Sequence, residues 1–348
     1  MLRLLFVQLV DHSLLLVRLL VSEPSLTARS VPERPALAPW YRMARDNGRV
    51  LFEHGGSVVT LEGRAAEVLL PTLLPLLDGT RTFAEIVETL GHAAEPSIAR
   101  ARESLAEGGL LTDGPELQVG LDSAPTAAAA AFVAAATRRA TPRAALAALA
   151  AADVAVAGES PDGAEIVRIA AQAGLDQVRH VALADSLAGH DLLICAPTPG
   201  EVLQLSAVNA ARLAHGGAWL SLLPHDGRSV VVGPLYLPGE SACYACYRTR
   251  RAAASGYEED YELVEAEPTK AACPAALSAV AAGLVVTLAL RWLAVRDSTL
   301  PGRCYALETG IVLGLSLHHV LRVPRCAICG PDEGSVPSPW FKETARDD

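Results

Sequence analysis

The chain has 348 residues, enough for two domains of ordinary size, and 51% of them are hydrophobic while 20% are charged. This composition predicts a globular protein and excludes a disordered, collagen-like or disulfide-dense chain. A net charge of −10 argues against nucleic-acid binding, because phosphate contacts require a basic surface. Four of the seven cysteines form two C-x-x-C pairs, a pattern typical of thiolate metal ligands in a reducing compartment, so we expect a cytoplasmic protein.

Two apolar segments are long enough to raise the question of a membrane. Residues 1–21 are interrupted by charged residues and are followed by no A-x-A-like cleavage site, so we expect neither a signal peptide nor a span, but an unstructured or poorly defined start. Residues 271–290 carry no charge, yet they lie between the two C-x-x-C pairs, which could not meet in one site across a membrane. We therefore expect a buried core helix there and no membrane contact.

The segment from residue 36 to 115 predicts a small α+β module. Three short strands are expected near residues 40–44, 49–52 and 57–61, separated by turn-forming Asp, Asn and Gly residues. Three helices follow: residues 65–77, kinked by proline; a helix that begins at the capping box of Thr82 and Glu85; and residues 96–106. Three strands followed by three helices indicate a winged-helix-like module.

Beyond an alanine-rich helical linker at residues 116–150, strands and helices alternate. Strands are expected at residues 154–157, 178–183, 191–196, 218–223, 229–237, 303–307 and 311–317, with helices at 163–173 and 201–215. Alternation of this kind is the signature of a mostly parallel sheet with crossover helices. The predicted organisation is therefore a poorly defined 1–35, a module at 36–115, the linker, an α/β domain at 151–335 and a tail at 336–348.

A degenerate glycine loop follows the first strand of the α/β domain. Gly158 and Gly163 occupy the outer positions of a G-x-G-x-x-G motif, but Ser160 replaces the middle glycine. Pro161 removes a backbone N–H, and the carboxylates of Glu159 and Asp162 repel phosphate. We interpret the loop as a structural strand-to-helix turn; the alternative is a surviving nucleotide site.

The two C-x-x-C pairs predict a structural metal site. Cys243, Cys246, Cys326 and Cys329 supply the four thiolates of a closed tetrahedral zinc site, and Gly330 allows the second pair to turn under its sulfurs. The alternative is redox chemistry, although neither pair is expected to open a helix as a thioredoxin motif does. Cys195 and Cys304 are predicted to be inert core residues.

Two further features carry weaker predictions. Cys273 precedes Pro274 at the start of the long apolar helix, where it is either a nucleophile or a small capping residue. The acidic run at residues 258–267 is expected to be a solvated, mobile loop.

Taken together, these motifs resemble the ThiF-like proteins of azole-forming peptide maturation, which are leader-peptide-binding partners of YcaO cyclodehydratases. Residues 150–330 resemble the ThiF adenylation fold in the loop at 158–163, the strand at 191–197, the stretch from Gly233 to Cys246 and the closing cysteine pair. Residues 39–113 resemble the PqqD-type recognition element of peptide-modifying enzymes. The chain departs from active adenylating members in its degraded loop and in the absence of an asparagine and arginine set closely following Asp185.

The resemblance implies that the module binds the leader of a ribosomally made precursor peptide and that the ThiF-like body docks onto a YcaO cyclodehydratase, itself without catalytic residues; it leaves room for a homodimer. In such modules a peptide adds as a strand beside the third strand and against the third helix. The implied leader-binding residues are Ser57, Val58, Val59, Thr60, Leu61, Arg102 and Leu105. Two alternatives are an active ATP-dependent adenylating enzyme acting on a peptide C-terminus and a winged-helix transcription factor, whose presumed recognition helix lacks a basic surface.

Overall fold

The computed structural model describes residues 31–46, 48–115, 125–185, 189–267, 271–310 and 313–330, and the backbone of residues 16–20. The chain divides into two compact units, Met1–Leu149 and Ala150–Asp348. The tail at 336–348 and the start of the predicted linker, residues 116–124, lie outside the described residues.

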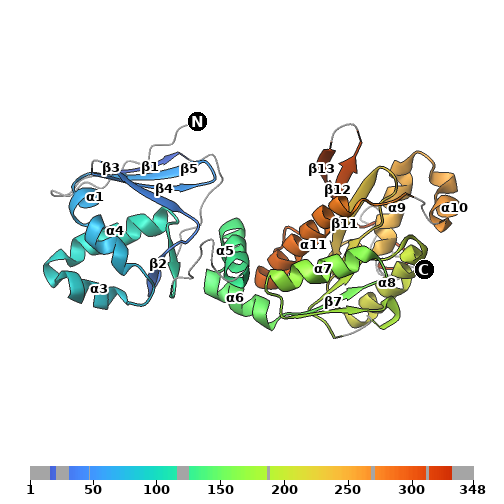
Figure 1. Ribbon diagram of the computed structural model, residues 1–348, viewed down its shortest axis with the longest axis horizontal. Helices are drawn as coiled ribbons and strands as arrows, with labels where there is room; N and C mark the ends of the chain where they lie inside the picture. Colours follow the sequence, from blue (N-terminus) through green and yellow to red (C-terminus); the bar gives the residue numbers. More distant parts are fainter. Residues whose placement is uncertain are drawn as a thin grey trace, which may run out of the picture. The chain divides into compact units, whose positions relative to one another are not determined.

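The first unit is built on a four-stranded antiparallel sheet in the order β1-β5-β4-β3 (Figure 1). Its strands are β1 (Leu16–Leu20), β3 (Arg42–Asp46), β4 (Arg49–His54) and β5 (Ser57–Glu62). The last three are the predicted strands, and they form a meander because each connection between them is only two residues long. Strand β1 was not predicted, and it lies in the segment expected to be poorly defined.

The helices that follow β5, between residues 64 and 107, lie together under one face of this sheet (Figure 1). Alternate residues of β4 and β5, namely Val50, Phe52, Val59 and Leu61, are buried and pack on Ile86, Ile98 and Leu105 of the helices. The helical elements are α1 (Arg64–Val68), α2 (Leu70–Leu73), η1 (Leu74–Leu76), α3 (Phe83–Leu90), η2 (His92–Ala94) and α4 (Glu95–Glu107).

Two predicted helix features are tested directly by these elements. The helix expected over 65–77 is broken into α1, α2 and a 3₁₀ turn, with Pro71 and Pro75 in the first turns of the second and third pieces. The capping box is confirmed: Thr82 Oγ1 accepts the N–H of Glu85, and the Glu85 carboxylate accepts the N–H of Thr82 at 2.7 Å.

The remaining elements of the first unit are short or rich in alanine. Strand β2 (Pro35–Leu37) pairs with β6 (Leu111–Asp113), and two helices follow, α5 (Pro125–Thr137) and α6 (Pro142–Ala151). Helix is therefore found where the linker was expected. However, Val133 and Ala134 of α5 and Leu149 of α6 are fully buried, so these helices pack as part of a core.

The second unit contains a seven-stranded sheet in the order β13-β12-β11-β10-β9-β7-β8 (Figure 1). Strands β8, β7, β9 and β10 are parallel, whereas β11, β12 and β13 are added antiparallel. The sheet is thus mixed, and the predicted mostly parallel sheet is right for only one half of it. The strands are β7 (Asp153–Ala157), β8 (Gln177–Val181), β9 (Leu192–Cys195), β10 (Trp219–Leu222), β11 (Ser229–Tyr236), β12 (Arg303–Thr309) and β13 (Leu313–His319).

Helices cover both faces of the central strands. On one face α7 (Pro161–Gln172) and α11 (Ala275–Val295) pack on each other and on the sheet (Figure 1). On the other face, inward residues of β7, β9 and β10 pack on α8 (Leu205–His215) and α9 (Tyr244–Ser255). Short 3₁₀ segments, η3 (Leu183–Asp185) and η4 (Pro199–Gln204), complete the connections.

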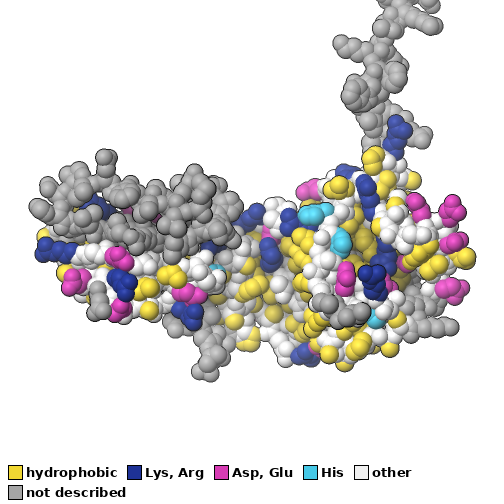
Figure 2. All heavy atoms as spheres, turned by 90° about the horizontal axis from the view of Figure 1, so that it is seen from above, with side chains coloured by type: hydrophobic (Ala, Val, Ile, Leu, Met, Phe, Trp, Pro, Cys, Tyr) yellow, Lys and Arg dark blue, Asp and Glu magenta, His cyan; other side chains and the backbone are white. Residues whose placement is uncertain are grey.

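The acidic run folds differently from the prediction. Residues 258–267 were expected to be a loop, but they form η5 (Glu258–Asp260) and α10 (Tyr261–Ala266). The physical reason is Tyr261, which is buried and stacks on Tyr257, so that one aromatic anchor holds the helix to the unit. Five of its six acidic residues are exposed, as predicted, and Glu265 is partly buried. Figure 2 shows acidic side chains gathered at the end of this unit that carries α10.

Helix α11 is long and apolar enough to cross a membrane by length and composition alone. Half of its most apolar stretch is buried inside the unit, against α7 and strands β10 and β11. This agrees with the predicted core helix.

Candidate metal centre and the glycine loop

Four cysteine sulfurs converge at one end of the sheet. Sγ of Cys243 lies 3.7 Å from that of Cys246 and 3.8 Å from that of Cys326, and Sγ of Cys246 lies 3.6 Å from that of Cys329. All four sulfurs lie within 4.8 Å of one another. A tetrahedral ion with metal–sulfur bonds of about 2.3 Å requires sulfur separations of about 3.8 Å. The donor set and its spacing therefore fit a closed tetrahedral metal site.

The first cysteine pair opens a helix, which corrects the sequence-based expectation. Cys243 is the N-cap of α9, and Cys246 lies in its first turn. The buried Asn209 of α8 accepts the N–H of Tyr244 through its Oδ1 at 2.9 Å, which fixes the start of the helix. The helical position alone would suit redox chemistry, but the second pair of sulfurs within contact distance favours a metal site instead.

The second pair lies on a tight turn after β13. The N–H of Gly330 donates to the carbonyl of Cys326 at 2.8 Å, and a Cβ added at Gly330 would lie 2.4 Å from that same oxygen. Glycine is required there because only a residue without a side chain allows this approach. Arg322 donates hydrogen bonds to the carbonyl of Cys329 in the second pair and to that of Gly239, which lies just before the first pair. It therefore links the two cysteine-bearing segments.

The electrostatics of the four thiols differ across the cluster. Burial raises the pKa of Cys243 and of Cys246 above the usual thiol range. Burial also opposes ionisation of Cys326, but hydrogen bonds from the backbone N–H groups of Cys329 and Ile328 lower its pKa to about 7. A bound cation would complete the ionisation of the buried pair, since thiolates are the ligand form.

The other three cysteines lie apart from this cluster. Burial raises the pKa of Cys195 in β9 to about 12 and that of Cys304 in β12 to about 11, in agreement with inert core residues. Cys273 is half-buried just before α11, and burial and the neighbouring Asp162 raise its pKa. The environment therefore disfavours the nucleophilic thiolate considered for Cys273.

The glycine loop lies where predicted, between β7 and α7. Gly158 has φ of +118°, and an added Cβ would lie 2.2 Å from the carbonyl oxygen of Ala196. At Gly163 an added Cβ would lie 2.9 Å from His180 Nε2, which itself contacts the Gly158 carbonyl at 2.7 Å. Both glycines thus serve close packing between the loop and the neighbouring strands.

The N–H groups of Glu159, Asp162 and Gly163 in this loop already have partners within the chain. Ser160 is the N-cap of α7: its Oγ accepts the N–H of Asp162, and its carbonyl accepts the N–H of Gly163. Glu201 Oε2 accepts a hydrogen bond from the N–H of Glu159 at 3.1 Å, and also from the N–H and the hydroxyl group of Thr198. A carboxylate of the protein therefore occupies a position where a phosphate would accept hydrogen bonds.

Sequence reasoning missed the part played by Glu201. The signal that could have revealed it is the capping-box pattern of Thr198 and Glu201 after the next strand but one. Its relation to the glycine loop depends on strands β7 and β9 being neighbours, which the local sequence does not encode.

The predicted leader-binding residues divide by exposure. Val59, Leu61 and Leu105 are buried in the core of the first unit, so their side chains cannot contact a docked peptide. Val58 and Thr60 are partly exposed on the opposite face of β5, whereas Ser57 is partly exposed at the start of the face that carries Val59 and Leu61.

Arg102, the implied leader-binding residue of α4, does not lie on a freely exposed face of this helix. Its guanidinium stacks 3.9 Å from the ring centroid of Phe83, and its Nε is buried without a hydrogen-bond partner among the described residues. Burial lowers its pKa, although the group stays cationic.

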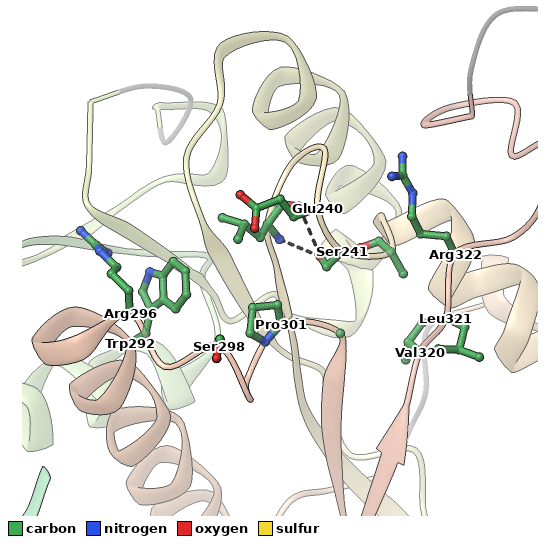
Figure 3. Close-up of a pocket in the computed structure, with 12 residues that line it drawn as sticks. Glu240, Ser241, Trp292, Arg296, Ser298, Pro301, Val320, Leu321 and Arg322 are labelled. Carbon is green, nitrogen blue, oxygen red and sulfur yellow. Dashed lines mark hydrogen bonds between the residues drawn. The ribbon is translucent and has the colours of Figure 1, made fainter. Parts of the chain in front are cut away.

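A cavity of about 650 Å³ lies in the second unit between the end of α11 and the turn before α9 (Figure 3). Trp292, Arg296, Glu240 and Arg322 line it, and Arg296 stacks over the indole at 5.2 Å. Its lining includes neither the four cysteines nor the glycine loop. However, Arg322, which lines the cavity, also donates to the carbonyl of Cys329 in the second cysteine pair.

Comparisons with known proteins identify the fold. No family model and no curated protein sequence matches the chain. Among solved structures, the heterocyclase TruD superposes with a TM-score of 0.66 over 86% of this chain at 21% identity. A heterocyclase in complex with substrate and cofactor gives 0.62 over 85% at 20% identity. The chain spans only 43% and 39% of these two proteins.

The E. coli protein MccB is matched over nearly its whole length. It superposes with a TM-score of 0.60 at 15% identity, covering 86% of this chain and 97% of MccB. Another structure shows this microcin C7 biosynthetic enzyme in complex with N-formylated MccA. At these identities the similarity establishes the fold, which this chain shares with the heterocyclase TruD and the microcin C7 biosynthetic enzyme MccB.

Proposed function

We propose that this protein binds the leader of a ribosomally made precursor peptide and presents it to a YcaO cyclodehydratase, without catalysing adenylation itself. The carrying observation is that similarity to the heterocyclase TruD extends over 86% of the chain, and so includes both compact units. In this proposal residues 36–115 are a PqqD-like, winged-helix-type recognition module and residues 151–335 are a ThiF-like body. The ThiF-like body docks onto the cyclodehydratase in the cytoplasm, alone or as a homodimer.

The glycine loop supports the non-catalytic part of the proposal. Adenylation requires backbone N–H groups that are free to bind the phosphates of ATP. In this chain the N–H of Glu159 donates to Glu201, Pro161 has none, and the N–H of Asp162 donates to Ser160. Three carboxylates, those of Glu159, Asp162 and Glu201, add charge of the same sign as the phosphates.

We further propose that the four cysteines hold one structural zinc ion. Zinc is the ion typical of four thiolates in tetrahedral geometry, and such a site has no open position for a substrate. The ion supplies folding free energy and no chemistry, so it is compatible with a protein that serves as a binding partner.

A second candidate function is an active ATP-dependent adenylating enzyme acting on a peptide C-terminus. The observation in its favour is the match to MccB, which has been solved with AMPCPP and MccA and which this chain covers over 99% of its length. The two candidates differ in one measurable property, because only the adenylating enzyme binds ATP without a partner.

Binding to fluorescently labelled precursor peptides encoded beside its gene tests the proposal. We expect saturable binding of one leader with and without ATP, no change in melting temperature on adding ATP, and no pyrophosphate release with the peptide present. Saturable ATP binding by the isolated protein would establish the second candidate, and failure of every neighbouring leader to bind would refute the first.

A matched pair of variants locates the binding edge. Val58→Glu with Thr60→Glu places two charges on β5 and should weaken leader binding at least about tenfold. Met43→Glu places a charge on the exposed strand β3 of the same sheet and should leave binding unchanged. If the β5 and β3 variants changed leader affinity equally, the leader would bind elsewhere than at β5.

A further inference from the structure

The edge of β5 that would receive a peptide is already paired within the chain. Strand β1 runs antiparallel to β5 over five residues, with Leu16 opposite Glu62, Arg18 opposite Thr60 and Leu20 opposite Val58. It is the first strand of the four-stranded sheet and is followed in space by β5, β4 and β3. A segment from the start of the chain thus forms the strand-to-strand contact that an added peptide would make.

The two outer strands of the meander β3-β4-β5 differ in charge. At one side, β3 carries Arg42, Arg45 and Asp46, and all five of its residues are exposed. Charged side chains on an edge strand discourage pairing with another chain. At the other side, the partly exposed residues of β5 before Glu62 are Ser57, Val58 and Thr60, which carry no charge. The chain therefore protects one edge and leaves the other suited to an added strand.

We propose that β1 is a resident strand that occupies the peptide-recognition edge of β5 and that a bound peptide must displace it. The occupant also indicates what the edge accepts: an extended segment running antiparallel to β5, of the composition Leu-Val-Arg-Leu-Leu, apolar with one central basic residue. The identification of the displacing peptide as a leader rests on the proposed function. The occupation of the β5 edge by β1 rests only on the observed strand pairing.

Displacement has a defined cost in affinity. A strand tethered to its own acceptor acts at an effective concentration on the order of millimolar, so it competes with any free peptide. If the edge is open about 10% of the time, the apparent affinity of a peptide falls about tenfold. A mutation that displaces β1 from the edge should therefore raise the apparent affinity of the peptide about tenfold.

Two full-length variants test the proposal with a probe taken from the chain itself. The probe is a labelled peptide of residues 14–22, Leu-Leu-Leu-Val-Arg-Leu-Leu-Val-Ser. In the variant Val17→Pro with Arg18→Pro, two adjacent N–H groups are lost, one of which must face β5 because successive N–H groups alternate in direction. The control, Val17→Ala with Arg18→Ala, keeps both N–H groups. We expect the probe to bind the proline variant at least about tenfold more tightly than the wild type, and the alanine variant to lie closer to wild type.

Hydrogen exchange provides the second measurement. In the proline variant, amides within residues 57–62 should exchange faster than in wild type, while those of β4 stay protected, which also shows that the module remains folded. Equal binding of the probe to wild type and proline variant, binding to neither, or unchanged exchange at 57–62 would each overturn the proposal.

A reversible lock covers the case in which the proline variant fails to fold. Arg18→Cys with Thr60→Cys places two cysteines directly opposite each other in the register. The oxidised protein should not bind the probe, and reduction should restore wild-type binding; probe binding that is indifferent to oxidation contradicts the proposal. These assays use only a segment of the chain itself, so a negative result would contradict the resident strand but not leader binding. Conversely, failure of every leader to bind would contradict the proposed function but not the resident strand.

Discussion

The glycine loop and the four-cysteine centre are two regions that the sequence marks with equal clarity, yet their polar groups are in opposite states. In the loop, the N–H groups of Glu159, Asp162 and Gly163 donate to acceptors of the same chain. At the cysteine centre, four sulfurs converge within 4.8 Å in the geometry of an ion that would bind all of them. A motif therefore indicates a binding site only when its ligand atoms converge on one point, as the four sulfurs do.

The largest effect is expected at the cysteine centre. Cys246→Ser should remove bound zinc from the purified protein and lower the free energy of unfolding by about 5 kcal/mol or more, because metal binding here is folding free energy. Metal analysis should find about one zinc per wild-type chain.

Cys273→Ser is the matched control for that variant. It changes a half-buried cysteine outside the cluster and should keep both the metal content and the melting temperature. If the wild-type protein, purified under reducing conditions, contained no metal, the cysteine centre would not be a metal site and would not differ from the glycine loop in binding a ligand.

The next largest effect is expected at Gly158. Gly158→Ala should destabilise the second unit by about 3 kcal/mol, because φ of +118° and a Cβ at 2.2 Å from a backbone oxygen both oppose a side chain. Gly200→Ala is the control, since nothing lies within 4 Å of its added Cβ. Denaturant unfolding followed by tryptophan fluorescence measures both, and equal stability of the two variants would show that the loop tolerates a side chain.

A smaller effect is expected at Glu201. Burial alone would raise its pKa, but hydrogen bonds from the N–H groups of Thr198 and Glu159 prevail and lower it. The carboxylate therefore stabilises the fold above its unfolded pKa of about 4.3, and this contribution is lost as the pH falls through the lower folded value. Glu201→Gln should cost about 1 kcal/mol at pH 7 and progressively less below about pH 4.

The same variant sharpens the comparison of the two regions. Neutralising one carboxylate leaves Pro161 and the Ser160 cap in place, so ATP should still produce no thermal shift in the Glu201→Gln protein. A shift on adding ATP would show that Glu201 alone keeps nucleotide out of the loop.

The smallest effect is expected at Arg102 in the first unit. Arg102→Met keeps the long side chain but removes the cation stacked on Phe83, and should cost about 0.5 to 1 kcal/mol. Arg100→Met on the same helix is the control and should be neutral. Thermal melts of the two variants make the measurement, and a neutral Arg102→Met would mean that the stacking adds nothing to stability.

Local signals in the sequence were sufficient where a structural element depends on neighbouring residues. The capping box at Thr82 and Glu85, the turns of the β3-β4-β5 meander and the apolar run of α11 were all predicted on this basis. The convergence of the cysteine pairs was also predicted, because tetrahedral coordination demands four ligands wherever they lie in the sequence.

The remaining features depend on contacts between distant segments. Strand β1 has no alternation of polar and apolar residues and is defined by its pairing with β5. Helix α10 depends on the burial of Tyr261. The partial burial of Arg102, in contrast, could have been predicted from the sequence. Arg102 lies four residues after Ile98, which is buried, and therefore borders the core face of α4.

The 83-residue separation of Cys243 and Cys326 gives the metal centre the topology of a reversible cross-link. A bridge closing a loop of this length reduces the entropy of the unfolded chain by an amount equivalent to about 4.5 kcal/mol. The enclosed segment contains α10, α11 and the β12-β13 hairpin, so the proposed zinc ion would restrain two of the three antiparallel strands of the sheet, β12 and β13, together with these helices. Withdrawing the proposed zinc ion would therefore loosen this segment, and returning the ion would tighten it again, without oxidising or reducing any thiol.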